Sequence, residues 1–274
     1  MNSSLPSFVI IFLLFVFDQS CSQTFDEHDF YYQRTENVIS SETEISSERN
    51  DDVDHSLKDS KHGVKMGVSN SDCDDGKANL EVDWDESPIN YTCYTPKERL
   101  LIDKNQPPAL ECEDISTDYV PQHYCMSTKI EYDTPLPTHA GHRPLWAMFG
   151  EYKFLPPQRW SHNIEHGSVV MLYHPCAHPH EVDKLRKIVT GCIRKHVISP
   201  YNLVPEDYPL VLMTWGCRLK MSQVDEKVVK HYIKEHALHG PEGHLSKEGQ
   251  YTHLLLTKAS IPEGSTFDDD VLCP

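Results

Sequence analysis

The sequence predicts an α+β fold, an α/β sandwich in which a small sheet carries two main helices packed on one face, linked by disulfides. Two observations predict this class. Short apolar, β-branched runs alternate with segments of helical periodicity, in the order strand, helix, strand, helix. Eight cysteines also remain once an expected N-terminal leader is removed, and this even number suggests up to four disulfides.

The first strand and helix are expected between residues 168 and 196. Ser168–Tyr173 is a short apolar run, typical of a buried strand. Pro179 can open a helix that continues to about His196, because proline suits the first helical position. The apolar face of this helix would comprise Val182, Leu185, Ile188, Val189, Cys192 and Ile193.

The second strand and helix follow directly. Pro209–Leu219 is another apolar run and predicts a strand. Ser222 is expected to cap the second helix, with Asp225 completing a weak capping box. The Gly-Pro pair at 240–241 would end that helix, and Tyr251–Thr257 would add one more strand. The buried stripe of this helix would be Val228, Val229, Tyr232 and Ile233.

The amino terminus has the layout of a signal peptide. The apolar run Phe8–Phe17 precedes small polar residues and a cleavage site near Gln23. A membrane-spanning helix needs about 20 apolar residues, and this run is roughly half as long. We therefore expect residues 1–22 to be a removed signal peptide, no transmembrane anchor in this chain, and a secreted, extracellular product.

The mature chain divides into two unlike parts. Residues 23–87 contain 18 acidic and 6 basic residues with few large apolar side chains, so we expect an acidic disordered segment. Residues 88–274 contain 23 acidic, 19 basic and 14 of the 17 histidines, and predict a His-rich domain with its core at about 127–258. The absence of a basic stripe argues against nucleic acid as a partner, whereas a protein partner stays open.

The cysteines and one sequon suggest an exported glycoprotein. No two cysteines are spaced as CxxC, so we expect structural crosslinks, although spacing does not choose among the pairings. Asn90 begins an Asn-Tyr-Thr glycosylation sequon, which would place it at the surface. The disulfide candidates are Cys73, Cys93, Cys112, Cys125, Cys176, Cys192, Cys217 and Cys273.

The most informative motif is H-x-x-E-H, formed by His162, Glu165 and His166. Helical residues four apart share a face, so both imidazoles could hold one metal ion while Glu165 acts as the catalytic base on a bound water. Inverted zinc peptidases carry this ligand pattern. Gly167 and the strand after it leave room for about two helical turns, and spacing fixes no third ligand, which weakens the peptidase interpretation.

Further histidines lie on both sides of this motif. His139 and His142 occupy a Pro/Gly loop upstream, and His174, His178 and His180 follow the first strand. Imidazole without free thiolates favours zinc or Cu(II). Two alternatives stay open, namely ordinary surface or hydrogen-bonded core histidines and a pH sensor. The metal site that we predict consists of His139, His142, His162 and His166.

Several short motifs together carry a family resemblance. They are Thr138–His142, Trp146, Gly150–Tyr152, His162–Gly167, Tyr173–Cys176 and Thr214–Cys217. On these motifs the segment from about Ile130 to His239 resembles the tumor protein p53-inducible protein 13 family of animals, and is similar to a domain of unknown function in bacterial exported proteins.

The resemblance implies no established biochemical reaction. It implies a link to growth suppression and, for some members, a membrane anchor, whereas we expect no carboxy-terminal span in this chain. The bacterial relatives generally lack the cysteines, which supports a crosslinking role for Cys176, Cys192 and Cys217.

Three functional hypotheses follow. The first is that the protein is a secreted, non-enzymatic module that interacts with a partner or binds a transition metal. The second is a zinc-dependent hydrolase that uses the H-x-x-E-H motif. The third is a purely structural extracellular domain whose histidines form buried hydrogen bonds.

Overall fold

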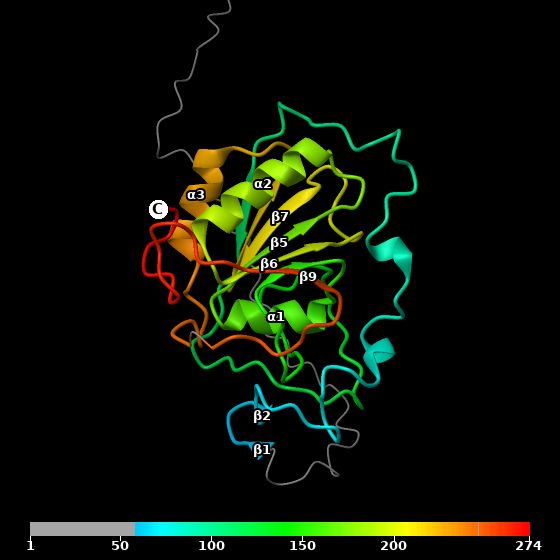
Figure 1. Cartoon of the computed structure of the whole chain (residues 1–274), viewed down its shortest axis with the longest axis vertical. Coiled ribbons are helices and arrows are strands. Elements are labelled where there is room, and N and C mark those ends of the chain that lie inside the picture. Colours follow the sequence, from blue (N-terminus) through cyan, green and yellow to red (C-terminus); the bar gives the residue numbers. More distant parts are fainter. Residues whose placement is uncertain (1–57, 246) are drawn as a thin grey trace, which may run out of the picture. The chain divides into compact units, whose positions relative to one another are not determined.

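The computed structural model describes residues 58–245 and 247–274. The expected signal peptide at 1–22 and residues 23–57 of the acidic segment lie outside the described residues. A mixed seven-stranded sheet with three α-helices forms the described fold (Figure 1), so the α+β prediction is confirmed.

The central strands of the sheet are buried on both faces. The strand order is β3-β8-β7-β5-β6-β4-β9, and β5 runs parallel to β6 and antiparallel to β7. Every residue of β6 and β7 is buried, and burial on both faces explains why β7 is an almost continuous apolar run that does not alternate with polar residues. The strands are β3 Ala109–Cys112, β4 Gly150–Tyr152, β5 Val169–Tyr173, β6 His196–Pro200, β7 Leu210–Thr214, β8 Cys217–Met221 and β9 Leu255–Lys258.

Helices cover both faces of the sheet. They are α1 Pro157–Glu165, α2 Pro179–Cys192 and α3 Glu226–His236. Met213 of β7 packs in one core cluster with Trp160 of α1. The next residue, Thr214, points to the opposite face and makes a 2.9 Å hydrogen bond with the Tyr232 hydroxyl of α3. Because α2 packs against α3, these two helices share one face, as predicted, and α1 lies on the other.

The elements around the second helix differ in detail from the prediction. The run 209–219 contains two strands, β7 and β8, because Gly216 adopts a φ of 72° and turns the chain between them. Asp225 is the N-cap residue of α3, since its carboxylate accepts the main-chain N–H of Lys227 at 2.8 Å. Ser222 instead accepts a hydrogen bond from the main-chain N–H of Asp103.

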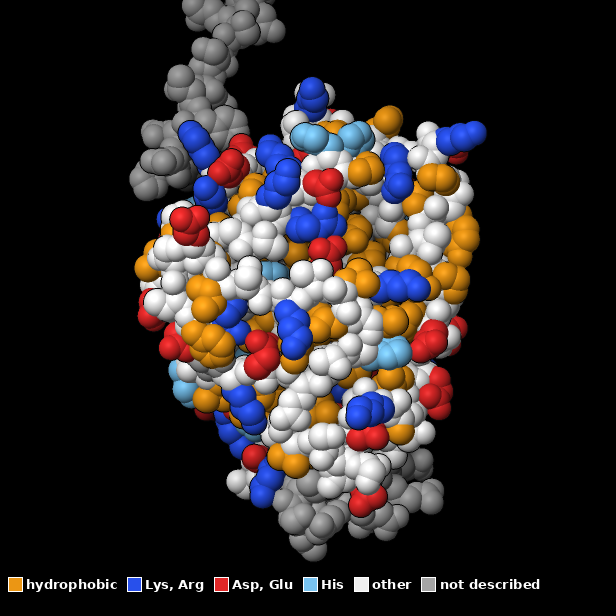
Figure 2. Space-filling view, in the orientation of Figure 1, with side chains coloured by type: hydrophobic (Ala, Val, Ile, Leu, Met, Phe, Trp, Pro, Cys, Tyr) orange, Lys and Arg blue, Asp and Glu red, His pale blue; other side chains and the backbone are white. Residues whose placement is uncertain are grey.

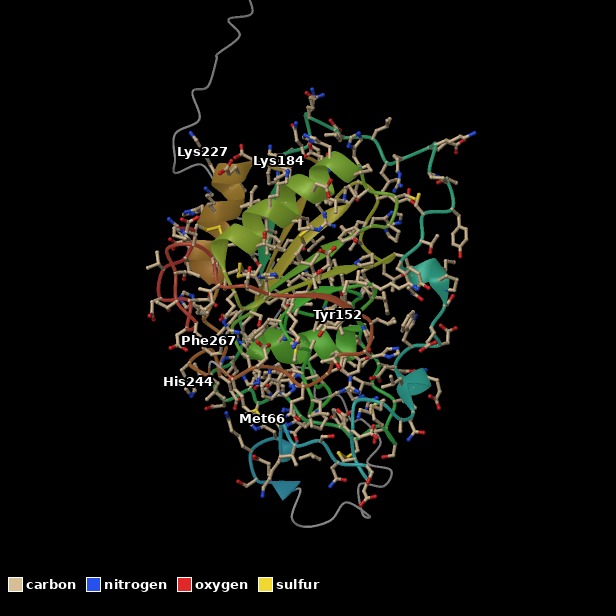
Figure 3. The ribbon with its side chains drawn as sticks, in the orientation of Figure 1. Met66, Tyr152, Lys184, Lys227, His244 and Phe267 are labelled. Atoms are coloured by element: carbon tan, nitrogen blue, oxygen red, sulfur yellow. A yellow bond between two sulfur atoms is a disulfide. The ribbon has the colours of Figure 1, made fainter. Side chains whose placement is uncertain are left out.

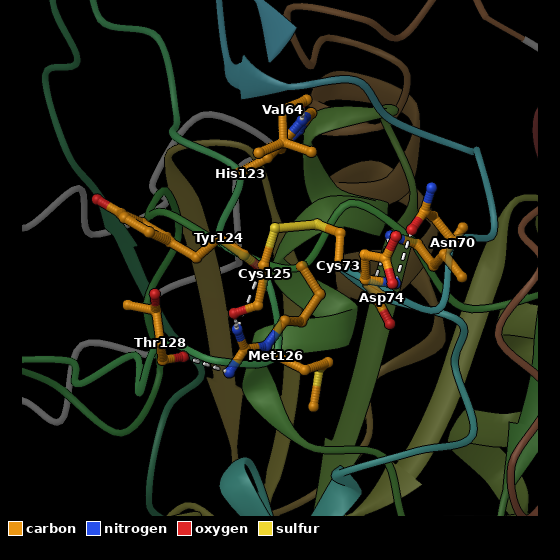
Figure 4. The surroundings of a disulfide bond; sticks show 12 residues. Val64, Asn70, Cys73, Asp74, His123, Tyr124, Cys125, Met126 and Thr128 are labelled. Carbon is orange, nitrogen blue, oxygen red and sulfur yellow. Dashed lines mark hydrogen bonds between the residues drawn. A yellow bond between two sulfur atoms is a disulfide. The ribbon is translucent and has the colours of Figure 1, made fainter. Parts of the chain in front are cut away.

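Residues 58–87 were expected to be disordered, and the structure corrects this expectation. Strands β1 (Lys58–Asp59) and β2 (Gly63–Val64) form a short antiparallel hairpin. A disulfide joins Cys73 to Cys125, beside Val64 and His123 (Figure 4). Residues 58–87 therefore form part of the folded structure.

Two carboxylates of this segment neutralise buried arginines. Asp74 accepts hydrogen bonds of 2.6 and 2.9 Å from both terminal nitrogens of Arg159 in α1. Asp83 makes a similar pair with Arg143, whose Nε lies 2.9 Å from its carboxylate. Both arginines have 0% exposed surface. Some of the acidic residues in this segment are therefore partners of buried arginines and are not solvated charges.

All eight candidate cysteines are paired. The four disulfides are Cys73–Cys125, Cys93–Cys176, Cys112–Cys217 and Cys192–Cys273. Cys112–Cys217 joins residues that face each other on β3 and β8. Such a set indicates an extracellular or other oxidising compartment.

The surface carries both signs of charge. Basic and acidic side chains are interspersed on the face seen in Figure 2. Lys227 of α3 is exposed, the half-buried Lys184 of α2 donates to the Val224 carbonyl at 2.7 Å, and Tyr152 of β4 is 1% exposed and lies in the interior (Figure 3). Asn90, the sequon residue, is half-buried, and its amide donates to Asn202 at 2.9 Å.

Within residues 58–245 and 247–274, every helix is too short or too polar to cross a bilayer.

The Asp74–Arg159 pair gives a test of how the N-terminal segment is held. Replacing Asp74 with Asn leaves a buried guanidinium without its counter-charge, so we expect the free energy of unfolding to fall by about 3–5 kcal/mol. Chemical denaturation of the purified protein measures this loss. The control is Glu131→Gln, because the Glu131 side chain is 76% exposed in its pair with Lys129 and should contribute little. Equal stability of the two variants would contradict the assigned role of Asp74.

Candidate metal centre

Three imidazoles and one carboxylate converge inside the protein. The ligand atoms of His123, His142, His162 and Glu165 all lie within 4.8 Å of one another. These residues are 2%, 0%, 0% and 0% exposed, respectively. The cluster is therefore removed from solvent.

Two extended segments place the first two imidazoles side by side. His142 donates its main-chain N–H to Gln122 at 2.9 Å, and its carbonyl accepts from Tyr124 at 2.9 Å, so the chain is paired on both sides of His123. Gly141 allows this approach, because a Cβ atom there would lie 2.5 Å from the Tyr124 ring. A side chain at position 141 would require the Tyr124 ring to move.

Helix α1 supplies the other two ligands. Pro157 occupies its first turn, and Gly167, with a φ of 77°, follows its C-terminal end. His162 and Glu165 are three residues apart and therefore lie on the same side of the helix. The helix is short, as expected from the sequence, yet long enough to direct both side chains into the cluster.

Main-chain carbonyls fix the orientation of all three imidazoles. The Nδ1 atom of His123 lies 2.6 Å from Val64 O, that of His142 lies 2.8 Å from Ala140 O, and that of His162 lies 2.6 Å from Arg143 O. A carbonyl oxygen can only accept, so each Nδ1 carries the proton and donates it. Each Nε2 is then left with a lone pair that points into the cluster, as in metal-binding histidines.

The inward-facing atoms have no hydrogen-bond partners. This holds for Nε2 of His123, His142 and His162 and for both carboxylate oxygens of Glu165. Nε2 of His142 lies 3.1 Å from Oε2 of Glu165, so two lone pairs face each other. In a tetrahedral zinc site, donor atoms about 2.1 Å from the ion lie roughly 3.4 Å apart. The spacing of these atoms therefore suits a cation placed between them.

Burial keeps the rings of His123 and His162 neutral. Desolvation, followed by the nearby His142, lowers the pKa of His123 to about 3. Desolvation and the neighbouring imidazoles also hold the pKa of His162 well below its usual range. Neutral imidazole is the form that binds metal, so the rings need no deprotonation at neutral pH.

A second group of side chains lies beside the first. His62, from the β1–β2 hairpin, stacks on His123 with ring centroids 4.8 Å apart. Its Nε2 is 3.6 Å from Oε1 of Glu165 and 3.7 Å from Oε1 of Glu242. Gly240 lets the loop after α3 approach, since a Cβ atom there would lie 2.2 Å from the Glu165 carbonyl oxygen.

The structure brings together part of the residue set proposed from the sequence. His142, His162 and Glu165 lie in the cluster. His166 is adjacent, with its ring stacked on that of His162 at 4.9 Å and its Nε2 3.9 Å from Glu242. His139 lies elsewhere, where its half-buried ring contacts Glu113 at 3.1 Å.

Sequence reasoning missed three residues of the site. His62, His123 and Glu242 belong to loops or short strands, where neither helical nor strand periodicity marks a functional position. The proximity of His123 to Cys125 was the available signal, because a disulfide fixes the chain around it.

The other candidate histidines take no part in the cluster. His174 accepts the main-chain N–H of Cys176 through Nδ1 at 3.1 Å, and the rings of His178 and His180 contact each other near the start of α2. His236 lies near Cys112 and Cys217, but these cysteines form a disulfide and offer no thiolate.

Fold and site together define a disulfide-crosslinked α+β domain with a buried His3Glu cluster that could hold a metal ion. Residues 123–249 match the model of the DUF3105 family, described as proteins of unknown function, so the chain contains a DUF3105 domain. All four cluster residues fall within the matched segment.

The curated relatives are distant. The chain is 32% identical over 66 residues to tumor protein p53-inducible protein 13 of Mus musculus, and equally to the protein of Rattus norvegicus. This stretch covers 24% of the chain and 17% of each relative, so the similarity is partial. No solved structure matches the chain.

The buried imidazoles predict acid sensitivity of the metal-free protein. The unfolded chain protonates histidine near pH 6.5, whereas the folded pKa of His123 is about 3. Between these values the unfolded state binds more protons, so the free energy of unfolding falls as the pH decreases. For His123 alone we expect a loss of about 2 kcal/mol between pH 6.5 and pH 5.

Denaturant titrations with chelator at several pH values measure this dependence. His123→Gln should give a shallower profile, whereas His180→Gln should leave it unchanged, because the His180 side chain is 75% exposed. A free energy of unfolding that stays constant over this pH range would show that the cluster is not neutral.

Proposed function

We propose that this domain is an exported metal-binding module that holds one divalent transition-metal ion through Nε2 of three histidines and the carboxylate of Glu165. The three histidines are His123, His142 and His162. One observation carries the proposal: each Nδ1 is committed to a main-chain carbonyl, and each Nε2 is buried, unpaired and part of a group of ligand atoms within 4.8 Å of one another that includes the Glu165 carboxylate.

The donor set favours Zn(II) or Cu(II). Neutral imidazole suits zinc, copper, iron and nickel, and all eight cysteines outside the leader are committed to disulfides. One carboxylate leaves a divalent ion with a single excess positive charge. Glu242 lies close enough to offset that charge, because its Oε1 contacts His62 next to the cluster.

Four protein ligands support a structural role for the ion. Structural zinc sites are closed by four protein ligands, whereas catalytic sites keep one position for water or substrate. An ion here would join the paired segments around His123 and His142 to helix α1. A hydrolase would require a path for substrate to Glu165, which is 0% exposed.

Secretion is part of the proposal. The disulfides fit an oxidising route, and the expected signal peptide would direct the chain into it. In that setting the ion would add a crosslink between segments that the disulfides do not join directly.

Metal analysis of untagged protein, secreted from cells supplied with zinc or copper, tests the proposal. We expect His162→Gln to lose the ion bound at this cluster, with an affinity loss of more than about 100-fold, because a direct ligand should matter more than the outer-shell groups. The matched control is His139→Gln, whose ring contacts Glu113 away from the cluster and should not affect binding. Folded wild-type protein without transition metal, and without uptake on titration, would overturn the proposal.

A further inference from the structure

We propose a second metal ion beside the first, bound by His62, Glu242 and the second carboxylate oxygen of Glu165. This inference rests on the proposed function, because Glu165 would contact both ions. The ligand atoms of the three side chains lie within 4.8 Å of one another.

The orientation of Glu165 supports a bridging carboxylate. Its Oε2 faces the first centre, 3.1 Å from Nε2 of His142 and 4.0 Å from that of His123. Its Oε1 faces away from that centre, 3.6 Å from Nε2 of His62. Neither oxygen has a hydrogen-bond partner. A carboxylate between two ligand sets can join two ions about 3.5–4 Å apart.

His62 and Glu242 each have one buried polar atom without a hydrogen-bond partner. Their side chains are 4% and 9% exposed, and both Nε2 of His62 and Oε2 of Glu242 lack hydrogen bonds. The distances of 3.6 and 3.7 Å from Nε2 of His62 to the two carboxylates exceed normal hydrogen-bond lengths. A cation among these donors would satisfy all of them and relieve the repulsion between the carboxylates.

His166 lies beside the second ligand set and does not belong to it. Its Nε2 lies 3.9 Å from Oε2 of Glu242 and has no hydrogen-bond partner. Trp146 packs on the His166 ring with centroids 4.3 Å apart, which shields this side of the site from solvent.

The second site lies at the solvent side of the cluster. Lys61, next to His62 in the hairpin, is 52% exposed in its side chain and reaches Oε1 of Glu242 at 3.6 Å. The ion would therefore fasten the β1–β2 hairpin to the loop after α3. Because His62 precedes the segment 123–249, this hairpin would add a ligand from outside the DUF3105 match.

Metal stoichiometry tests the second ion. We expect untagged, secreted wild-type protein to bind two ions per chain, and His62→Gln and Glu242→Gln to bind one. The matched controls are His253→Gln and Glu86→Gln, since this pair makes a comparable His–Glu contact of 3.1 Å away from the cluster. Both controls should retain two ions.

The outcomes separate the two proposals. A wild-type protein with one ion, unchanged by His62→Gln, overturns the second ion and leaves the proposed function intact. Absence of bound metal in folded wild-type protein overturns both. If either variant fails to fold, the Cu(II)-loaded wild-type protein decides by electron paramagnetic resonance. Magnetic coupling between two Cu(II) ions through the Glu165 carboxylate should reduce the integrated signal below the value expected from the amount of copper bound. A signal that accounts for all of the bound copper contradicts the second ion.

Discussion

The hydrogen bonds from three imidazoles to main-chain carbonyls determine the arrangement of the buried centre. Val64, Ala140 and Arg143 supply these carbonyls, and each belongs to a segment held in place by other contacts. Val64 ends the hairpin that precedes the Cys73–Cys125 disulfide, and the Arg143 side chain is paired with Asp83. Rigid backbone therefore selects one tautomer for each ring and directs all three lone pairs to one point.

Sequence patterns predicted the parts of the fold in which periodicity and burial agree. The strand at β5 and the helices α2 and α3 follow from apolar runs and stripes. The strands β3, β4 and β6 did not, because β3 and β4 contain only four and three residues and β6 includes His196, Ser199 and Pro200. Composition also gave a wrong prediction of disorder for residues 58–87. Asp74 and Asp83 add to the acidic count there but act as partners of buried arginines. Local charge counts cannot distinguish a solvated carboxylate from a buried one.

Only part of the candidate site could be predicted from the sequence, for a related reason. Helical spacing placed His162 near Glu165, since residues on one helical face are neighbours whatever the tertiary fold. His123 and His62 reach the same point through loop pairing and a hairpin, which depend on contacts between distant segments. His139 precedes His142 by three residues, but the chain there is not helical, and its ring lies against Glu113 instead.

Each disulfide joins one cysteine within residues 123–249 to one outside it, so the flanking segments are fastened to the DUF3105 domain at four points. The complete burial of the His3Glu ligands has a consequence for how a metal would arrive. An ion would reach a closed interior only slowly, so metallation would mainly accompany folding, and the metal available where the polypeptide folds would determine which ion is bound. Later exchange would then depend on rare opening of the native state and not on the metal content of the surrounding fluid.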